Sequence, residues 1–221
     1  MIYLTGDTHN DFSKLSNKSL KKQGLKLTED DYVIVAGDFG LCWAHDKTFD
    51  WNCKWFAKRS FTTLWVQGNH ENYDMIAEYP LEKWHGGLVR HIVRDKVILL
   101  ERGQIFNIEG HTFFTFGGAA SHDIPDGALD RNDPEFEIKL KGRRRDWIPY
   151  RIIGESWWPQ ELPTEQEMQT GLDNLAKADF TVDYVITHCC ATDLQTAIVH
   201  YLNKPSKADV LTDYFQALEG K

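Results

Sequence analysis

Four short runs of aliphatic, β-branched and aromatic residues each end directly in a cluster of polar side chains, and this repeated pattern constrains the fold more than any other feature of the chain. The runs cover residues 2–5, 32–36, 63–67 and 183–187. The clusters read Gly6-Asp7-Thr8-His9-Asn10-Asp11, Gly37-Asp38-Phe39-Gly40, Gly68-Asn69-His70-Glu71 and Thr187-His188-Cys189-Cys190. Because the carboxyl ends of parallel strands meet at one edge of a sheet, we expect the four clusters to share one crevice.

Four more strand-like runs lie between the third and the fourth of these strands. They cover residues 89–93, 97–100, 104–108 and 112–116, and the charged and glycine-containing pairs between them predict hairpins in an antiparallel or mixed second sheet. A helix is predicted from about residue 164 to 178, where Thr-Glu-Gln-Glu has the form of a capping box. The order of elements predicts an α/β fold in which two stacked mixed sheets are flanked by helices.

Residues 121–163 differ in composition from the rest of the chain. They hold five of the seven prolines, a basic run from Lys139 to Arg145, and the pair Trp157-Trp158. Long segments of this kind inside compact domains are often functional, so we expect a loop over the active face, with a solvated insertion as the alternative. The 221 residues, 42% of them hydrophobic, are expected to form one domain over residues 1–221.

Net charge and hydropathy limit the classes of binding partner and the cellular compartment that we expect. The net charge of −8 disfavours general binding of nucleic acid. No apolar run approaches the roughly 20 residues of a membrane-spanning helix. The N-terminus has no basic segment followed by an apolar one, as a secretory signal would. We therefore expect a cytoplasmic protein that does not associate with membranes.

The ordered set of clusters carries far more information than its single members. Taken alone, Asp7, Asp38 or Asn69 would be interpreted as a turn or helix-capping residue after a strand. A Gly-Asn-His-acid sequence, however, is expected only about 0.004 times by chance in a chain of this composition, and here it directly follows a predicted strand. Oxygen and imidazole ligands together suit manganese, iron or zinc, whereas oxygens alone would indicate magnesium or calcium.

The set Asp7-x-His9, Gly37-Asp38, Gly68-Asn69-His70-Glu71 and His188 resembles the motifs of the calcineurin-like metallophosphoesterase superfamily over residues 6–188. Within that superfamily the chain is similar to bacterial and phage enzymes labelled serine/threonine phosphatases. The resemblance implies a two-sheet αββα sandwich that holds two divalent metals. It also implies hydrolysis of a phosphate monoester or diester by a metal-bound hydroxide.

The resemblance also implies roles for individual residues. The metal ligands carried over are Asp7 and His9 for the first metal, Asp38 as the bridging carboxylate, and Asn69 and His188 for the second metal. His70 resembles the acid that assists the departing oxygen, and Glu71 is a candidate to orient a neighbouring imidazole. We expect manganese as the metal, with iron or zinc as the alternatives.

Two parts of the superfamily pattern are absent from the chain. Gly40 stands where the second motif often continues to an aspartate or to Asp-Arg-Gly, so a phosphate-binding arginine must come from elsewhere. Arg131, Arg145 and Arg151 are the candidates, because guanidinium groups suit phosphate oxygens. The closing Gly-His-x-His motif, which gives each metal one more histidine, does not occur. Its absence predicts a C-terminally shortened domain and weaker binding of the second metal.

The sequence is compatible with two functions that belong to different classes. The first is a hydrolase that acts on a phosphorylated substrate of unspecified class, with a phosphodiesterase or nuclease as the alternative within that class. Nucleic acid is a disfavoured substrate, although the basic run and Trp157-Trp158 would suit a single strand locally. The second is a catalytically impaired or non-catalytic protein that binds phosphorylated ligands or a partner. Turnover that needs both a metal and His70 separates the two.

Overall fold

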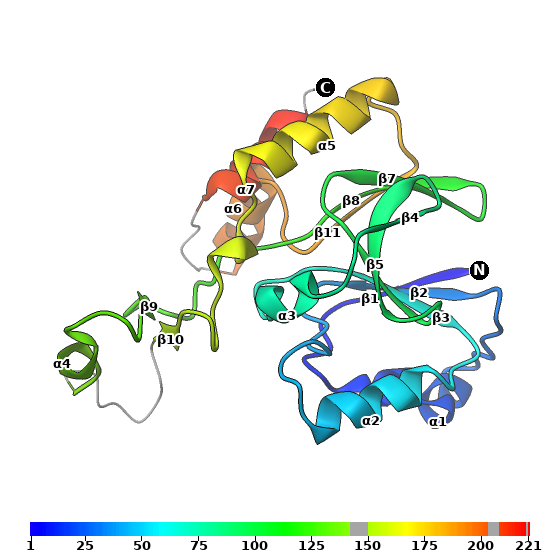
Figure 1. The fold of residues 1–221 in the computed structure, drawn as a ribbon. Helices are drawn as coiled ribbons and strands as arrows, with labels where there is room; N and C mark the ends of the chain where they lie inside the picture. The colour runs from blue at the N-terminus through cyan, green and yellow to red at the C-terminus, as the bar shows by residue number, and fades with distance from the viewer. Residues whose placement is uncertain (142–149, 203–207, 220) are drawn as a thin grey trace.

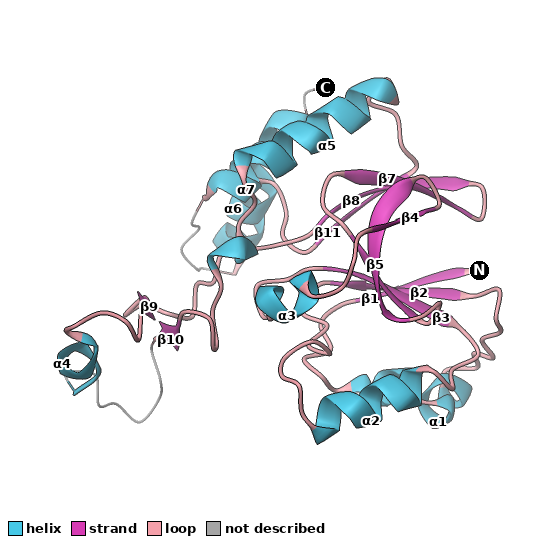
Figure 2. Ribbon diagram, viewed as in Figure 1, coloured by secondary structure: helices cyan, strands magenta, loops and turns pink. Residues whose placement is uncertain are grey.

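Two β-sheets stack face to face between layers of helices in a computed structural model that describes residues 1–141, 150–202, 208–219 and 221 (Figure 1). Helices α1 (Asn17–Lys22) and α2 (Lys47–Phe56) cover the outer face of the first sheet, and α5 (Glu165–Lys177) and α7 (Val210–Leu218) lie over the second. Figure 2 shows the same four layers by element type. The predicted α/β sandwich of mixed sheets is confirmed.

The first sheet has six strands in the order β1-β2-β3-β6-β5-β4. Their bounds are β1 Ile2–Thr5, β2 Tyr32–Ala36, β3 Thr62–Val66, β6 Val97–Leu100, β5 Gly87–Val93 and β4 Glu82–Trp84. Strands β1, β2, β3 and β6 pair in parallel with one another, whereas β5 pairs antiparallel with both β6 and β4.

The assignment of residues 89–93 and 97–100 to the second sheet was wrong. These runs form most of β5 and all of β6, and β6 pairs in parallel with β3 of the first sheet. All four residues of β6 are buried, so both of its faces are covered. A continuous apolar run of this kind is typical of an interior strand in a sheet with two covered faces, and this is the physical reason that β6 belongs beside β3.

The second sheet has three strands in the order β11-β8-β7, with β11 at Tyr184–Thr187, β8 at His111–Phe116 and β7 at Gln104–Ile108. Strand β11 runs parallel to β8, and β7 and β8 form a hairpin. The fourth polar cluster therefore follows a strand of the second sheet. It still reaches the others because β1 and β11 are outer strands on the same side, where Leu4 and Tyr184 line one groove.

Three apolar layers hold this arrangement together. One lies between the first sheet and its helices and includes Trp65 and Phe56, and another fills the space between the sheets, around Leu64 and Phe106. The third packs α5 and α7 on the second sheet. Helix α5 begins at the predicted capping box, where Glu167 N donates to Thr164 Oγ1 at 3.2 Å and Thr164 N donates to Glu167 Oε2 at 2.7 Å. The predicted helix is confirmed at residues 165–177.

Residues 121–163 form a segment that we call the excursion, and most of its described part projects away from both sheets (Figure 1). The excursion contains β9 (Ala128–Leu129), α4 (Phe136–Lys141), β10 (Arg151–Ile152) and a 3₁₀ turn at Pro159–Glu161. Its two ends meet where Ser121 contacts Glu161. Trp158 also donates to Asp74 of α3 (Tyr73–Ala77) at 2.8 Å. Among the described residues, no helix has the length and apolar character needed to cross a membrane.

Candidate metal centre

The loops that follow β1 and β2 are joined by backbone hydrogen bonds. The carbonyl oxygen of Asp38 accepts from Thr8 N at 3.1 Å and from His9 N at 2.9 Å. Three non-glycine residues in these loops have left-handed backbone conformations, with φ of 44° at His9, 66° at Asn10 and 47° at Asp38. His, Asn and Asp tolerate this region better than other side chains, and residues in it cluster at functional sites. The backbone therefore turns sharply where the predicted ligands lie.

Two glycines of the polar clusters allow backbone and ligand side chains to approach closely. A Cβ atom on Gly37 would overlap the ring of His188, and Gly37 also has a φ of 94° that other residues rarely adopt. A Cβ atom on Gly68 would overlap the carboxylate of Asp38. The glycines that begin the second and third clusters thus leave the space into which His188 and Asp38 fit.

Asp7, His9 and Asp38 form one group of potential donor atoms, all within 4.8 Å of one another. His9 Nε2 lies 3.8 Å from Asp7 Oδ2 and 3.6 Å from Asp38 Oδ2. These distances exceed a good hydrogen bond. They fit ligands of a common ion, since two atoms each about 2.1 Å from one ion can be at most about 4.2 Å apart. The three residues predicted for the first metal and the bridge are therefore brought together.

His188 approaches the other oxygen of Asp38. Its Nε2 atom lies 3.5 Å from Asp38 Oδ1, and its Nδ1 atom lies 2.7 Å from the carbonyl oxygen of Ala36. Because a carbonyl oxygen only accepts, Nδ1 carries the proton and Nε2 keeps its lone pair toward Asp38. Nδ1 also lies 3.9 Å from Asp7 Oδ1, but the shorter contact to Ala36 decides the tautomer.

Asp38 belongs to the group with Asp7 and His9 and also contacts His188. Its side chain is only 4% exposed, whereas the side chains of Asp7 and His9 are 52% and 55% exposed. One carboxylate oxygen faces His9 and the other faces His188. A shared anion between two cations is the arrangement that lowers their mutual repulsion.

The third cluster contributes Asn69 and His70, which follow β3. The backbone N–H of His70 donates to Asp38 Oδ1 at 2.8 Å, which ties this cluster to the candidate bridge. Asn69 Nδ2 donates to Ser121 Oγ at 3.2 Å. Among the described residues, no hydrogen bond reaches Asn69 Oδ1, and this oxygen is the atom that a ligand amide would present. Ser121 was not predicted as a site residue, and no sequence pattern marks it.

The ring of His70 borders a pocket beside these donor atoms. The pocket has a volume of about 280 Å³ and is lined by His9, Asn10, Gly40, Trp43 and His70. The rings of His9 and His70 lie 5.4 Å apart in an edge-on arrangement. Within the described part of the chain, no hydrogen bond or ion pair joins the His70 ring to a carboxylate.

Among the residues that the structure describes, Glu71 accepts hydrogen bonds from backbone N–H groups and contacts no imidazole, unlike the role predicted for it. Its carboxylate accepts from Phe39 N at 2.9 Å and from Gly40 N at 3.4 Å. Burial raises the pKa of Glu71 to about 8, although the hydrogen bonds from Phe39 and Gly40 act in the opposite direction. Glu71 therefore holds the loop that carries Asp38. Within the described residues, the imidazole that approaches the site from β11 is oriented by Ala36.

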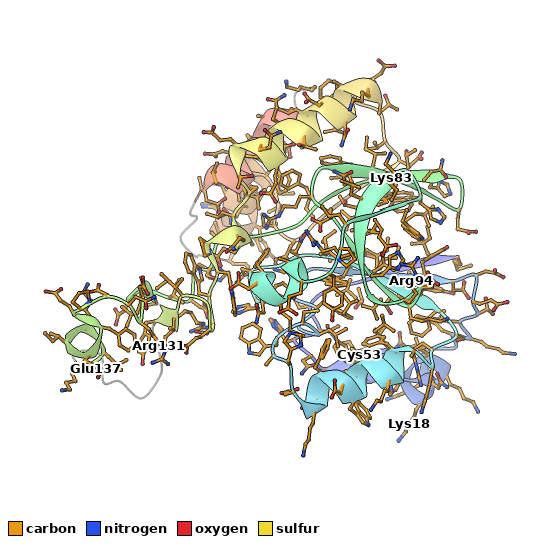
Figure 3. All side chains as sticks on the ribbon, viewed as in Figure 1. Lys18, Cys53, Lys83, Arg94, Arg131 and Glu137 are labelled. Carbon is orange, nitrogen blue, oxygen red and sulfur yellow. The ribbon has the colours of Figure 1, made fainter. Side chains whose placement is uncertain are left out.

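All three candidate phosphate-binding arginines belong to the excursion in sequence, and the two that the structure describes have carboxylate partners there. Arg131 pairs with Glu155, and Figure 3 shows Arg131 on the segment that projects from the sheets. Arg151 pairs with Asp123. Arg145 lies outside the described residues. The structure thus does not bring Arg131 or Arg151 into hydrogen-bond contact with the predicted metal ligands, and their role stays a prediction.

The residues fit a divalent metal. Two carboxylates and an imidazole place donor atoms within 4.8 Å of one another, and a second imidazole presents an unprotonated nitrogen to the buried carboxylate. This oxygen and nitrogen donor set suits manganese, iron or zinc. Divalent ions would also offset the negative charge of Asp38, which is placed close to the buried Glu71.

Comparison with known proteins gave one family. A model described as calcineurin-like phosphoesterase matches residues 1–215. A search of curated proteins found no match, and a search of solved structures also found none.

Proposed function

Because this chain belongs to the calcineurin-like phosphoesterase family, we propose that it is a metal-dependent phosphoesterase that uses two divalent ions. The observation that carries the proposal is the position of Asp38, whose two carboxylate oxygens face the imidazoles of His9 and His188. A carboxylate so placed suits a pair of cations on either side of it.

The residues that would hold the ions divide into two groups. Asp7 and His9 would hold the first ion, Asn69 and His188 would hold the second, and Asp38 would bridge them. Manganese is the expected metal, with iron or zinc as the alternatives. When bound, such ions supply Lewis-acid chemistry, because they acidify water and neutralise charge on phosphoryl oxygens.

The protein's own residues would orient the reactants and move a proton. His70 borders the pocket of about 280 Å³ beside the ligands, where the departing part of a substrate would lie. Its imidazole would give a proton to the departing oxygen as the P–O bond breaks, which is general acid catalysis. The hydrogen bond from His70 N to Asp38 Oδ1 keeps this imidazole next to the candidate bridge.

A phosphorylated substrate is therefore the proposed partner. The experiment that tests the proposal measures hydrolysis of an aryl phosphate monoester and an aryl phosphate diester by chelator-treated protein, with and without added Mn²⁺, Fe²⁺ or Zn²⁺. Turnover that requires a metal and is lost in His70→Ala supports the proposal, and the better of the two esters identifies the class. Metal binding without turnover of either ester would favour the non-catalytic alternative.

A further inference from the structure

Asn69 has a side-chain amide that can be placed in two ways, and its neighbours select one. An amide offers an NH₂ group at one end and a carbonyl oxygen at the other, and the two ends have almost the same shape. Only the oxygen can bind a metal ion. For a ligand of this type, the residues that hold the NH₂ group therefore decide whether the oxygen faces the ion.

Ser121 and Glu161 together fix what the amide can do. Ser121 Oγ lies 2.6 Å from Glu161 Oε2, and Ser121 N donates to Glu161 Oε1 at 2.8 Å. A carboxylate only accepts, so the single hydroxyl proton of Ser121 points at Glu161. The hydroxyl oxygen is then left to accept, and Asn69 Nδ2 donates to it at 3.2 Å. The amide oxygen of Asn69 must point away from Ser121.

The residue that carries this carboxylate is buried, and its backbone is held by a buried arginine. Glu161 is only 3% exposed. The guanidinium of Arg102, also buried, donates to the carbonyl oxygens of Gln160 at 2.8 Å and Glu161 at 3.1 Å. Arg102 further donates to Tyr73 Oη at 3.0 Å, and Tyr73 donates to the carbonyl oxygen of Gly68 at 2.7 Å. The same buried group thus supports both the end of the excursion and the residue that precedes Asn69.

We propose that Ser121 and Glu161 are positioning residues that hold the Asn69 amide with its oxygen toward the second metal ion. The inference rests on the proposed function, because it assigns Asn69 to that ion. The contact between Ser121 and Glu161 closes the two ends of the excursion, so the same pair joins the excursion to a predicted metal ligand. Groups that orient metal ligands typically change metal affinity about 10–100-fold when they are removed.

The test measures Mn²⁺ binding by calorimetry, together with hydrogen exchange of the Asn69 side-chain amide by NMR in the metal-free protein. For Ser121→Ala we expect the affinity for the second ion to fall about 10-fold and the first to be unchanged. Hydrogen exchange of the Asn69 side-chain amide should be faster in this variant than in the unaltered protein. Glu161→Gln should act in the same direction, because a glutamine can donate to Ser121 and reverse its hydroxyl. Ser121→Thr keeps the hydroxyl and should restore both measurements.

Two further variants separate the possible outcomes. Ser156→Ala is the matched control, because it removes a serine hydroxyl that accepts from Ile152 N at 2.9 Å within the excursion but touches no predicted ligand. Asn69→Ala shows the full effect of losing the amide. Faster amide exchange in Ser121→Ala with unchanged affinities would overturn the positioning role and leave the two-ion proposal standing. If the unaltered protein and Asn69→Ala each bind only one ion, there is no second ion site, and both the two-ion proposal and the positioning role are wrong.

Discussion

The Nδ1 atom of His188 lies 2.7 Å from the carbonyl oxygen of Ala36, the last residue of β2. This contact joins the second sheet to the first directly beside Asp38. It also determines the tautomer, because Nδ1 must carry the proton and Nε2 is left with its lone pair 3.5 Å from Asp38 Oδ1. An imidazole held in this way is ready to bind a metal without reorientation, as in many metal sites where the second nitrogen donates to a carbonyl.

Asp38→Asn should weaken the binding of both metal ions. The substitution removes the negative charge whose two oxygens face His9 and His188, while the amide keeps nearly the same volume. Metal content after dialysis, measured by atomic emission, should fall at both positions. Asp11→Asn is the matched control, because Asp11 only caps a turn by accepting from Ser13 N at 3.0 Å, and asparagine caps equally well. Full metal content in Asp38→Asn would contradict the bridging role.

His70→Asn should retain the metals and lower turnover by about 10²–10⁴-fold, the usual contribution of a general acid. The ring borders the pocket beside the donor atoms, and only its backbone N–H contacts Asp38. Turnover of the aryl phosphate and metal content are measured on the same samples. His200→Asn, an exposed histidine on α6 (Thr192–Tyr201), should change neither. A loss of metal in His70→Asn would instead make this histidine a ligand.

Gly37→Ala should weaken metal binding because its Cβ atom would overlap the ring of His188. Gly110→Ala is the matched control: it has a φ of 80°, close to the 94° of Gly37, but a Cβ atom there meets no atom within 4 Å. Both variants should lose the roughly 1–2 kcal/mol that a left-handed backbone costs an alanine. Only Gly37→Ala should also lose affinity for Mn²⁺, by at least about 10-fold. Equal affinities in the two variants would mean that His188 is not a ligand.

Glu71→Ala should lower the free energy of unfolding of the metal-free protein by about 1–3 kcal/mol. The substitution leaves the buried N–H of Phe39 without its acceptor, and an unpaired buried donor costs about that much. Urea denaturation in the presence of a chelator measures the change. Glu78→Ala removes an exposed carboxylate that pairs with His45 and should change the free energy by less than about 1 kcal/mol. Similar values for the two variants would show that Glu71 does not stabilise the loop.

The sequence was sufficient to predict the strands that carry the site. Runs such as β2 are apolar and directly followed by Gly-Asp, so both the strand and its end are local properties of the chain. The sequence was not sufficient to predict which of the two sheets a strand belongs to. Strands β5 and β6 follow hairpin-like spacings that suit either sheet, and only the parallel pairing of β6 with β3 decides between them. Pairing between distant strands depends on packing that no local pattern records.

By itself the sequence determined the donor types, their order along the chain and the family, because carboxylate, amide and imidazole groups after strands are a chemical inventory that needs no coordinates. Only the tertiary structure decided which neighbours contact these donors and the loops that carry them. Glu71 turned out to hold the backbone of Phe39, Ala36 to set the tautomer of His188, and Ser121 to hold the Asn69 amide. These contacts span 32, 152 and 52 positions of the sequence. The reason is physical: a hydrogen bond depends on distance and direction in space, and folding brings such residues together only through the packing of the whole sandwich.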